Sequence, residues 1–401
     1  MPVNMPELTK LKPVSGVRLN SICAGIKRTD RDDVTLFEFI EGTTCAAVFT
    51  KNAFCAAPVE IAKQHLTEMM PRFWLINSGN ANAGTGENGL VNAKRSCSSV
   101  SILGKCEENQ VLPFSTGVIG QPLPVEKIES ILPDLLHGLK ENNWLKAARA
   151  IMTTDTVPKG ISVEIIINEQ KVTITGISKG AGMIRPDMAT MLAFIATDAK
   201  IESNLLQNCL NKAVEKSFNR ITIDGDTSTN DACVLAATGK SVEFNQENIA
   251  TFQIALEQVC IHLAQSIVRD GEGATKFITV EVLQGKTEQE CLNVAYTIAH
   301  SPLVKTAFFA SDANWGRILA AVGRAGVSNL DLNAVEIYLG DVCIVRNGGR
   351  DLDYTEEQGQ KVMSQPEILV QICLHRGNAQ TQVWTCDFSY DYVKINAEYR
   401  T

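Results

Sequence analysis

The sequence predicts an α/β protein in which mixed or antiparallel β-sheets are covered by helices. Short β-rich runs bounded by Gly, Asn or Thr alternate with longer stretches that are apolar at i, i+3, i+4 and i+7. Strands that follow one another through tight turns favour mixed or antiparallel sheets over purely parallel ones. No Pro/Gly/Ser-rich linker, low-complexity tract or internal repeat interrupts the 401 residues, so we expect two or three closely joined domains.

The expected elements follow from these two periods. The β-rich runs are residues 34–42, 44–52, 72–80, 161–170 and 171–180, and the last two form a hairpin around NEQK. The helical stretches are residues 124–142, 202–220 and 248–270. Ser203 is the expected N-cap of the second helix, and the third begins after Asn248. A strand-rich tail follows, with runs at 276–285, 334–349, 367–377 and 381–389.

Composition excludes several classes of protein. The net charge is −8 and no run of Lys or Arg forms a basic stripe, which argues against a nucleic-acid partner. The N-terminus lacks the apolar region of a signal peptide and no segment has eighteen consecutive apolar residues, so we expect a cytoplasmic protein without membrane contact. The twelve cysteines are spread singly, without a C-x-x-C pair, and are expected to be small buried hydrophobic residues in a reducing compartment.

Two glycine- or aspartate-rich motifs suggest ligand sites. GTGENG matches G-x-G-x-x-G at Gly84, Gly86 and Gly89, but seven residues separate it from the preceding strand, whereas a dinucleotide fingerprint begins directly at the strand end. DGDTSTND resembles the start of a calcium loop, but Thr229 and Leu235 stand where Gly and a bidentate Glu are required. We therefore interpret the second motif as a turn held by its own side chains, and we expect no metal.

A threonine without a neighbouring histidine points to another chemistry. The five histidines form neither H-E-x-x-H nor an i, i+4 pair, and no G-x-S-x-G elbow is present. Thr190 lies in RPDMATMLAF, after the small Ala189 and a segment with two glycines and a proline. A Thr at a chain N-terminus can use its own α-amine as the base, so cleavage before Thr190 would create such a nucleophile. The alternative is that Thr190 is an ordinary core strand residue.

The segment SKGAGMIRPDMATMLAFIATDA resembles the self-processing segment of the ArgJ-type glutamate N-acetyltransferase / ornithine acetyltransferase family, which is cut between Ala and Thr. Further blocks resemble that family in order along nearly the whole chain. They are NSGNANAGTGENG, FSTGVIG, AIMTTDTVPK, IDGDTSTNDA, DGEGATKFI, DANWGRI and DYVKINAEYRT.

The resemblance implies cleavage between Ala189 and Thr190, which gives an α piece of residues 1–189 and a β piece of residues 190–401 that together form one catalytic core. Thr190 would be the nucleophile, and Thr116 and Gly117 would form the oxyanion hole. The family's substrate-binding positions fall on Thr154, Lys179, Thr190, Glu272, Asn396 and Thr401. Among them, Lys179 and Glu272 can pair with the carboxylate and the ammonium group of an amino acid. Thr153 is an alternative to Thr154.

The family further implies an N-terminal-nucleophile-like α/β sandwich with a smaller C-terminal α+β region, assembled as a heterotetramer of two α and two β pieces. The implied reaction moves acetyl from N2-acetyl-L-ornithine to L-glutamate through an acetylated Thr190. Acetyl-CoA is a candidate co-substrate, since some members use it as donor, and no other cofactor is expected. The alternatives are a self-processing amide hydrolase or aminopeptidase, and a non-catalytic ligand-binding protein with an uncut chain.

Overall fold

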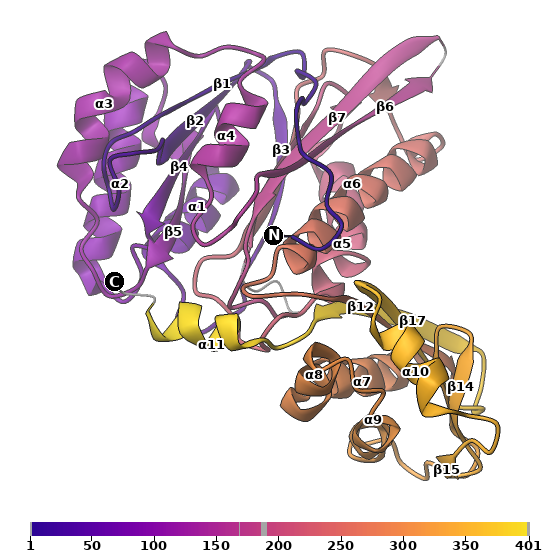
Figure 1. Ribbon diagram of the computed structural model, residues 1–401. Helices are drawn as coiled ribbons and strands as arrows, with labels where there is room; N and C mark the ends of the chain where they lie inside the picture. Colours follow the sequence, from indigo (N-terminus) through magenta and orange to yellow (C-terminus); the bar gives the residue numbers. More distant parts are fainter. Residues whose placement is uncertain (1, 168, 186–190, 399–401) are drawn as a thin grey trace. The chain divides into compact units, whose positions relative to one another are not determined.

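The computed structural model describes residues 2–167, 169–185 and 191–398, and these form two compact units (Figure 1). The larger unit contains Glu7–Asn219 and Asp226–Ile267. The C-terminal unit contains Met1–Pro6, Arg220–Gly225 and Val268–Thr401. The expected cleavage site, Ala189–Thr190, lies outside the described residues.

Two sheets form the centre of the larger unit. The first has the order β1-β2-β4-β5, in which only β4 and β5 are parallel. The second has the order β3-β10-β8-β7-β6, in which only β10 and β8 are parallel. Their strands are β1 (Val17–Ile22), β2 (Val34–Phe39), β3 (Thr44–Phe49), β4 (Phe73–Asn80), β5 (Val111–Val118), β6 (Lys159–Ile167), β7 (Gln170–Lys179), β8 (Leu192–Thr197) and β10 (Ala232–Ala237). The short strands β9 (Lys200–Ile201) and β11 (Glu243–Phe244) pair separately.

An aromatic core lies between these two sheets. Phe37 and Trp74 from the first sheet contact Phe194 from the second, with ring centroids 5.9 Å apart in both pairs. Alternate residues of β1, β2, β4, β5, β8 and β10 point into this layer, as expected when one face of a sheet packs on another sheet. The sandwich predicted from the family resemblance is therefore present in the larger unit.

Helices cover the outer faces of the sandwich. Helices α2 and α3 enclose a second apolar cluster on the first sheet, while α5 and α6 lie against the second sheet (Figure 1). The helices of this unit are α1 (Ala57–Glu68), α2 (Gly86–Gly104), α3 (Val125–His137), α4 (Trp144–Ala150), α5 (Ser203–Glu215) and α6 (Ile249–Arg269), whose last two residues belong to the other unit.

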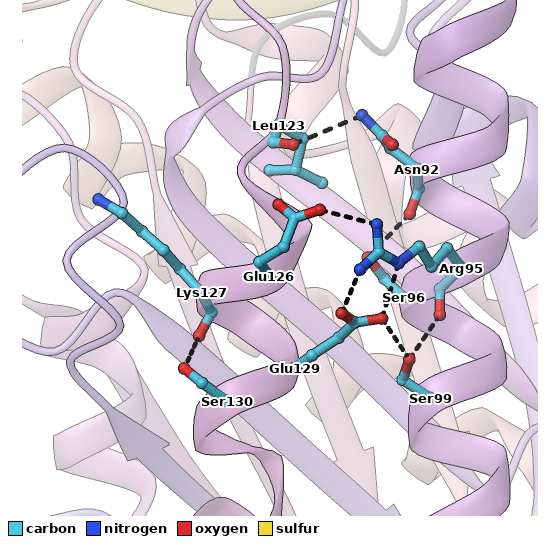
Figure 2. A network of polar contacts seen from close by, with 9 residues as sticks. All are labelled: Asn92, Arg95, Ser96, Ser99, Leu123, Glu126, Lys127, Glu129 and Ser130. Carbon is cyan, nitrogen blue, oxygen red and sulfur yellow. Dashed lines mark hydrogen bonds and ion pairs between the residues drawn. The ribbon is translucent and has the colours of Figure 1, made fainter.

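An exposed ion-pair network joins α2 to α3, and Figure 2 shows it. The Arg95 guanidinium donates to Glu126 Oε1 and Glu129 Oε1, both at 2.8 Å, and Ser99 Oγ donates to Glu129 at 3.0 Å. Because Arg95 is 44% exposed, the pairs contribute little to stability, and the apolar cluster beneath them holds the two helices in place.

The C-terminal unit is built on one six-stranded sheet with the order β15-β14-β13-β16-β12-β17, in which only β12 and β16 are parallel. Its strands are β12 (Phe277–Gly285), β13 (Glu336–Leu339), β14 (Val342–Arg346), β15 (Gly349–Arg350), β16 (Glu367–Cys373) and β17 (Ala379–Cys386). Its helices are α7 (Glu288–Ala299), α8 (Pro302–Phe309), α9 (Trp315–Gly323), α10 (Glu356–Met363) and α11 (Tyr390–Ala397). A single apolar cluster fills the space between the sheet and α7 to α9, which confirms the α+β region.

Most expected elements are present, with one correction. The hairpin is confirmed, because Ile167 pairs with Gln170 across β6 and β7. The N-cap of α5 is Glu202 and not Ser203, since the Glu202 carboxylate accepts from the main-chain N–H groups of Asn204 and Leu205. The prediction relied on the general preference for Ser at the N-cap position. It did not consider that a carboxylate there also interacts favourably with the helix dipole.

The strands on either side of the expected cut belong to one sheet. β7 ends at Lys179 and β8 begins at Leu192, and these two residues pair directly in antiparallel register. Residues from both expected pieces therefore form the same sheet. None of the described helices is long and apolar enough to cross a membrane. All twelve cysteines are free thiols, and seven are buried.

Candidate active site

Thr116 and Gly117 lie at the end of β5, beside the end of β4. Thr116 pairs with Ser78 and Gly117 with Gly79, and a bulge follows at Asn80. Gly117 has φ +135°, and a Cβ there would lie 2.3 Å from the carbonyl carbon of Gly79 and 2.5 Å from Asn80 N. Only glycine fits this close approach of two backbones. The position of the Gly117 backbone N–H group therefore depends on a close contact between β4 and β5 that requires glycine.

Asparagine side chains bond the main chain around these strand ends. Asn77 Nδ2 donates to Asn80 O at 2.8 Å, and Ser115 Oγ donates to Asn77 Oδ1 at 2.6 Å. Asn80 Nδ2 donates to the carbonyls of Gln121 and Pro122, both at 3.1 Å. Because an amide both donates and accepts, it replaces the ladder bonds that the bulge interrupts. This accounts for the amide-rich sequence NSGNANA.

Lys179 lies beside the Thr116 hydroxyl. Its Nζ donates to Thr116 Oγ1 at 3.3 Å, and both side chains are buried, with residue exposures of 8% and 9%. An ammonium group only donates, so Thr116 Oγ1 is the acceptor and its own O–H can donate to another oxygen. The pair combines a cation from the end of β7 with a hydroxyl donor from the end of β5, an arrangement suited to a developing oxyanion.

Asp155 connects the predicted threonine turn to Lys159 and β7. Its carboxylate accepts from Thr153 N at 2.9 Å and from Gly180 N at 2.7 Å, and it forms a fully buried ion pair with Lys159 at 2.6 Å. Thr154 lies in this turn and is half-buried. The turn is therefore fixed to the residue that follows Lys179. Asp155 directly follows the predicted residue Thr154 in the block AIMTTDTVPK. Nothing in that sequence indicates that Asp155 connects the turn to β7.

Asp231 lies beside the residue that follows Thr190. Asp231 is 1% exposed and precedes β10, and its carboxyl accepts from the main-chain N–H of Met191. Burial raises the pKa of this carboxyl well above its usual range, against the opposing effects of the Met191 N–H, the Lys179 cation and Ser228. Thr190 and Ala189 themselves lie outside the described residues.

Glu272 and Asn396 come together in the C-terminal unit. Asn396 Nδ2 donates to Glu272 Oε2 at 2.9 Å, and Glu272 is buried. Ser389 Oγ donates to Gly273 O at 2.6 Å, so the loop that carries Glu272 is held by the residue that caps α11. Two of the predicted substrate residues therefore contact each other although they are 124 positions apart. Thr401 lies outside the described residues.

The motif DGDTSTND divides between the two units after Gly225. Its second part is the turn that the sequence predicts, because Asn230 N donates to Ser228 Oγ at 3.1 Å. Among the described residues, no group of three or more His, Cys, Asp or Glu side chains is placed to hold a metal ion. The sequence predicts Asn230 and Asp231 only as turn residues, yet both are buried, and their side chains bond the main chain at the strand ends described above.

Comparisons with known proteins show which family the sequence belongs to. The sequence matches the ArgJ family over residues 18–401. It is 57% identical over 406 residues to the arginine biosynthesis bifunctional protein ArgJ of Pseudomonas fluorescens (strain Pf0-1), with 100% of both chains covered. It is also 57% identical to the protein of the same name from Methylococcus capsulatus (strain ATCC 33009 / NCIMB 11132 / Bath), with 98% of this chain and 97% of that chain covered.

Two solved structures are also similar in sequence. The crystal structure of the arginine biosynthesis bifunctional protein ArgJ from Bacillus halodurans is 40% identical, with 50% of this chain and 95% of that chain covered and a TM-score of 0.48. The ornithine acetyltransferase from Mycobacterium tuberculosis, complexed with ornithine, is 32% identical, with 43% of this chain and 92% of that chain covered and a TM-score of 0.37.

Proposed function

Because this chain belongs to the ArgJ family, we propose that it transfers acetyl from N2-acetyl-L-ornithine to L-glutamate in arginine biosynthesis. The chain cleaves itself between Ala189 and Thr190. The new α-amine of Thr190 takes the hydroxyl proton while Oγ attacks the acetyl carbonyl. The C–N bond then breaks, the proton passes to the departing ornithine, and glutamate's amine takes acetyl from the Thr190 ester in the reverse sequence.

The remaining site residues have distinct roles in this proposal. Thr116 O–H and Gly117 N–H bind the oxyanion, and the hydrogen bond from Lys179 to Thr116 Oγ1 at 3.3 Å is the observation that carries the assignment. Thr154 and the Lys179 cation contact the amino-acid substrate. Glu272, Asn396 and Thr401 bind its polar and charged groups.

The assembly and location follow from the same family. The two pieces associate as a heterotetramer of two α and two β pieces in the cytoplasm. No cofactor is required besides the substrates. Because the curated relatives are named bifunctional, we extend the proposal to a second activity in which acetyl-CoA replaces acetylornithine as donor.

The test is to trap the acetyl group. Protein mixed with acetyl-labelled N2-acetylornithine and quenched in denaturant should carry label on the 190–401 piece, and glutamate should remove it as N-acetylglutamate. Thr190→Ala should remain uncut and unlabelled. Label released as free acetate at the same rate with and without glutamate would contradict the transferase and favour the amide hydrolase. Parallel reactions with labelled acetyl-CoA decide the second activity.

Thr116→Val tests the oxyanion hole better than a change at Gly117. Valine keeps the shape and removes only the hydroxyl, whereas a Cβ at Gly117 would meet backbone atoms at 2.3 Å. Loss of one oxyanion donor typically lowers kcat by about 10²- to 10³-fold. An unchanged kcat in folded Thr116→Val protein would remove this residue from the mechanism.

A further inference from the structure

The dipeptide Asn230–Asp231 lies between the two strand ends on which the proposed function depends. It directly precedes β10, which pairs with β8 in parallel register from Ala232 opposite Leu192. Both side chains are buried, with exposures of 6% and 1%. Each contacts the main chain of a different element, so the dipeptide joins segments that are far apart in sequence.

Asn230 holds the strand end that carries the oxyanion residues. Its Nδ2 donates to Ser115 O at 3.0 Å and to Ala81 O at 2.7 Å. Its Oδ1 accepts from Thr229 Oγ1 at 2.5 Å. Since both partners of Nδ2 are carbonyls, only the nitrogen can face them, and the orientation of the amide is settled. Ser115 immediately precedes Thr116, so this bond fixes the peptide plane that leads into the oxyanion hole.

Asp231 and its successor hold the strand that begins after the nucleophile. The Asp231 carboxyl accepts from Met191 N, and Ala232 N donates to Met191 O at 3.1 Å. Met191 is thus bonded at both its N–H and its carbonyl. Met191 directly follows Thr190 in the chain, so these bonds hold the main chain of the residue next to the nucleophile.

We propose that Asn230 and Asp231 are positioning residues that set the spacing between the oxyanion hole and Thr190. This inference rests on the proposed acetyl transfer. Adjacent residues have little freedom relative to each other, so holding Ser115 with one and Met191 with the next transfers a fixed spacing to the two strand ends. Acyl transfer depends on that spacing, because a misplacement of about 1 Å can cost roughly 100-fold in rate.

Asn230→Asp is the first test, with Asn143→Asp as its matched control. Asn230→Asp places an oxygen against two carbonyl oxygens. Asn143 Nδ2 also donates to two main-chain carbonyls, those of Leu19 at 2.9 Å and Gly138 at 3.4 Å, but at α4. We expect Asn230→Asp to lower kcat roughly 100-fold with the KM for N2-acetylornithine changed less than threefold. Asn143→Asp should keep kcat. Equal kcat values in the two folded variants would overturn the inference.

Asn230→Ala is the second variant if Asn230→Asp does not fold, because it removes the donor without introducing a repelling oxygen. The same fall in kcat at constant KM is expected. A fall that matches only the fraction of folded protein, measured by urea titration, would show a structural role and overturn the inference.

Asp231→Val and Asp231→Asn separate positioning from packing at the second strand. Valine removes the acceptor for Met191 N–H, whereas asparagine retains an acceptor oxygen in the same shape. Acetylation of Thr190 should be slowed roughly 100-fold in Asp231→Val and largely restored in Asp231→Asn. Equal rates in both would contradict the role of the bond to Met191.

Measurements on the wild-type chain distinguish failure of the proposed function from failure of the positioning role. If it is neither cut nor acetylated, the proposed function fails, and this inference fails with it. If the wild type is cut and acetylated and the Asn230 and Asp231 variants match it, only the positioning role is wrong.

Discussion

Two buried aspartates of the larger unit, Asp155 and Asp231, have opposite surroundings. The Asp155 carboxylate accepts from two main-chain N–H groups and pairs with the buried Lys159. Asp231 accepts from Met191 N and contacts Ser228, and its Oδ2 has no partner within the part of the chain that the structure describes. Both are at least nine-tenths buried, so the difference between them lies in their donors.

That difference decides their charge. Burial raises the pKa of both carboxyl groups. At Asp155 the cations Lys159 and Lys179, with the hydrogen bonds, outweigh burial and hold the pKa well below its usual range. At Asp231 burial dominates and the pKa is raised well above its usual range. The Lys179 cation acts on both groups, so one charged and one readily protonated carboxyl share this cation.

The largest effect is expected for Asp155→Asn, which leaves Lys159 buried without its carboxylate. Breaking one partner of a buried ion pair costs about 3–5 kcal/mol in the free energy of unfolding. Urea titration at pH 7 measures it, with the exposed Asp134→Asn as the control. A loss equal to that of the control would mean that the pair does not stabilise the larger unit.

Asp231→Asn should change how stability depends on pH. Because the pKa of Asp231 is raised in the folded state, the folded protein keeps a proton that the unfolded chain loses near pH 3.9. Protonated Asp231 therefore contributes to the free energy of unfolding at low pH, and this contribution is lost as pH rises through the folded pKa. In that window the wild type should lose up to about 1.4 kcal/mol per pH unit relative to Asp231→Asn. The comparison requires urea titrations of both proteins from pH 4 to 9. Parallel curves would show that Asp231 is charged in the folded state.

Asp155 should give the opposite pH dependence. Because its folded pKa is lowered, its contribution is present above the unfolded pKa of about 3.9 and is lost as pH falls through the folded value. Acid unfolding of the wild type and of Asp155→Asn, followed by circular dichroism, measures the difference. The difference in stability between the wild type and Asp155→Asn should decrease as pH falls. A difference that increases would contradict the lowered pKa.

The smallest effect on stability is expected for Lys179→Met, which removes the cation shared by both aspartates. The pKa values of Asp155 and Asp231 should both rise, because a favourable charge is removed from each. The loss of stability at pH 7 should be on the order of 1 kcal/mol, since Lys159 still pairs with Asp155. Carboxyl carbon NMR titration reads both groups. A rise at only one of them would show that Lys179 does not couple the pair.

The sequence predicted the parts of the fold whose signal is local. The hairpin of β6 and β7 and the helices α3, α5 and α6 follow from periodicity, whereas the roles of Thr116 and Lys179 come from the family's blocks and stay predictions. The contact of Asn230 with Ser115 joins residues 115 positions apart, and no local pattern reports it. The Asp, Ser and Thr residues of DGDTSTND correctly predicted a turn held by local hydrogen bonds. They could not show which strands pack against that turn.

The central claim is that the chain cuts itself before Thr190 to create its own base. Mass spectrometry of the intact purified protein in denaturant tests it most directly. The account predicts two masses, those of residues 1–189 and 190–401, which together exceed the uncut chain by one water. A single full-length mass would contradict it, because Thr190 would then have no free α-amine.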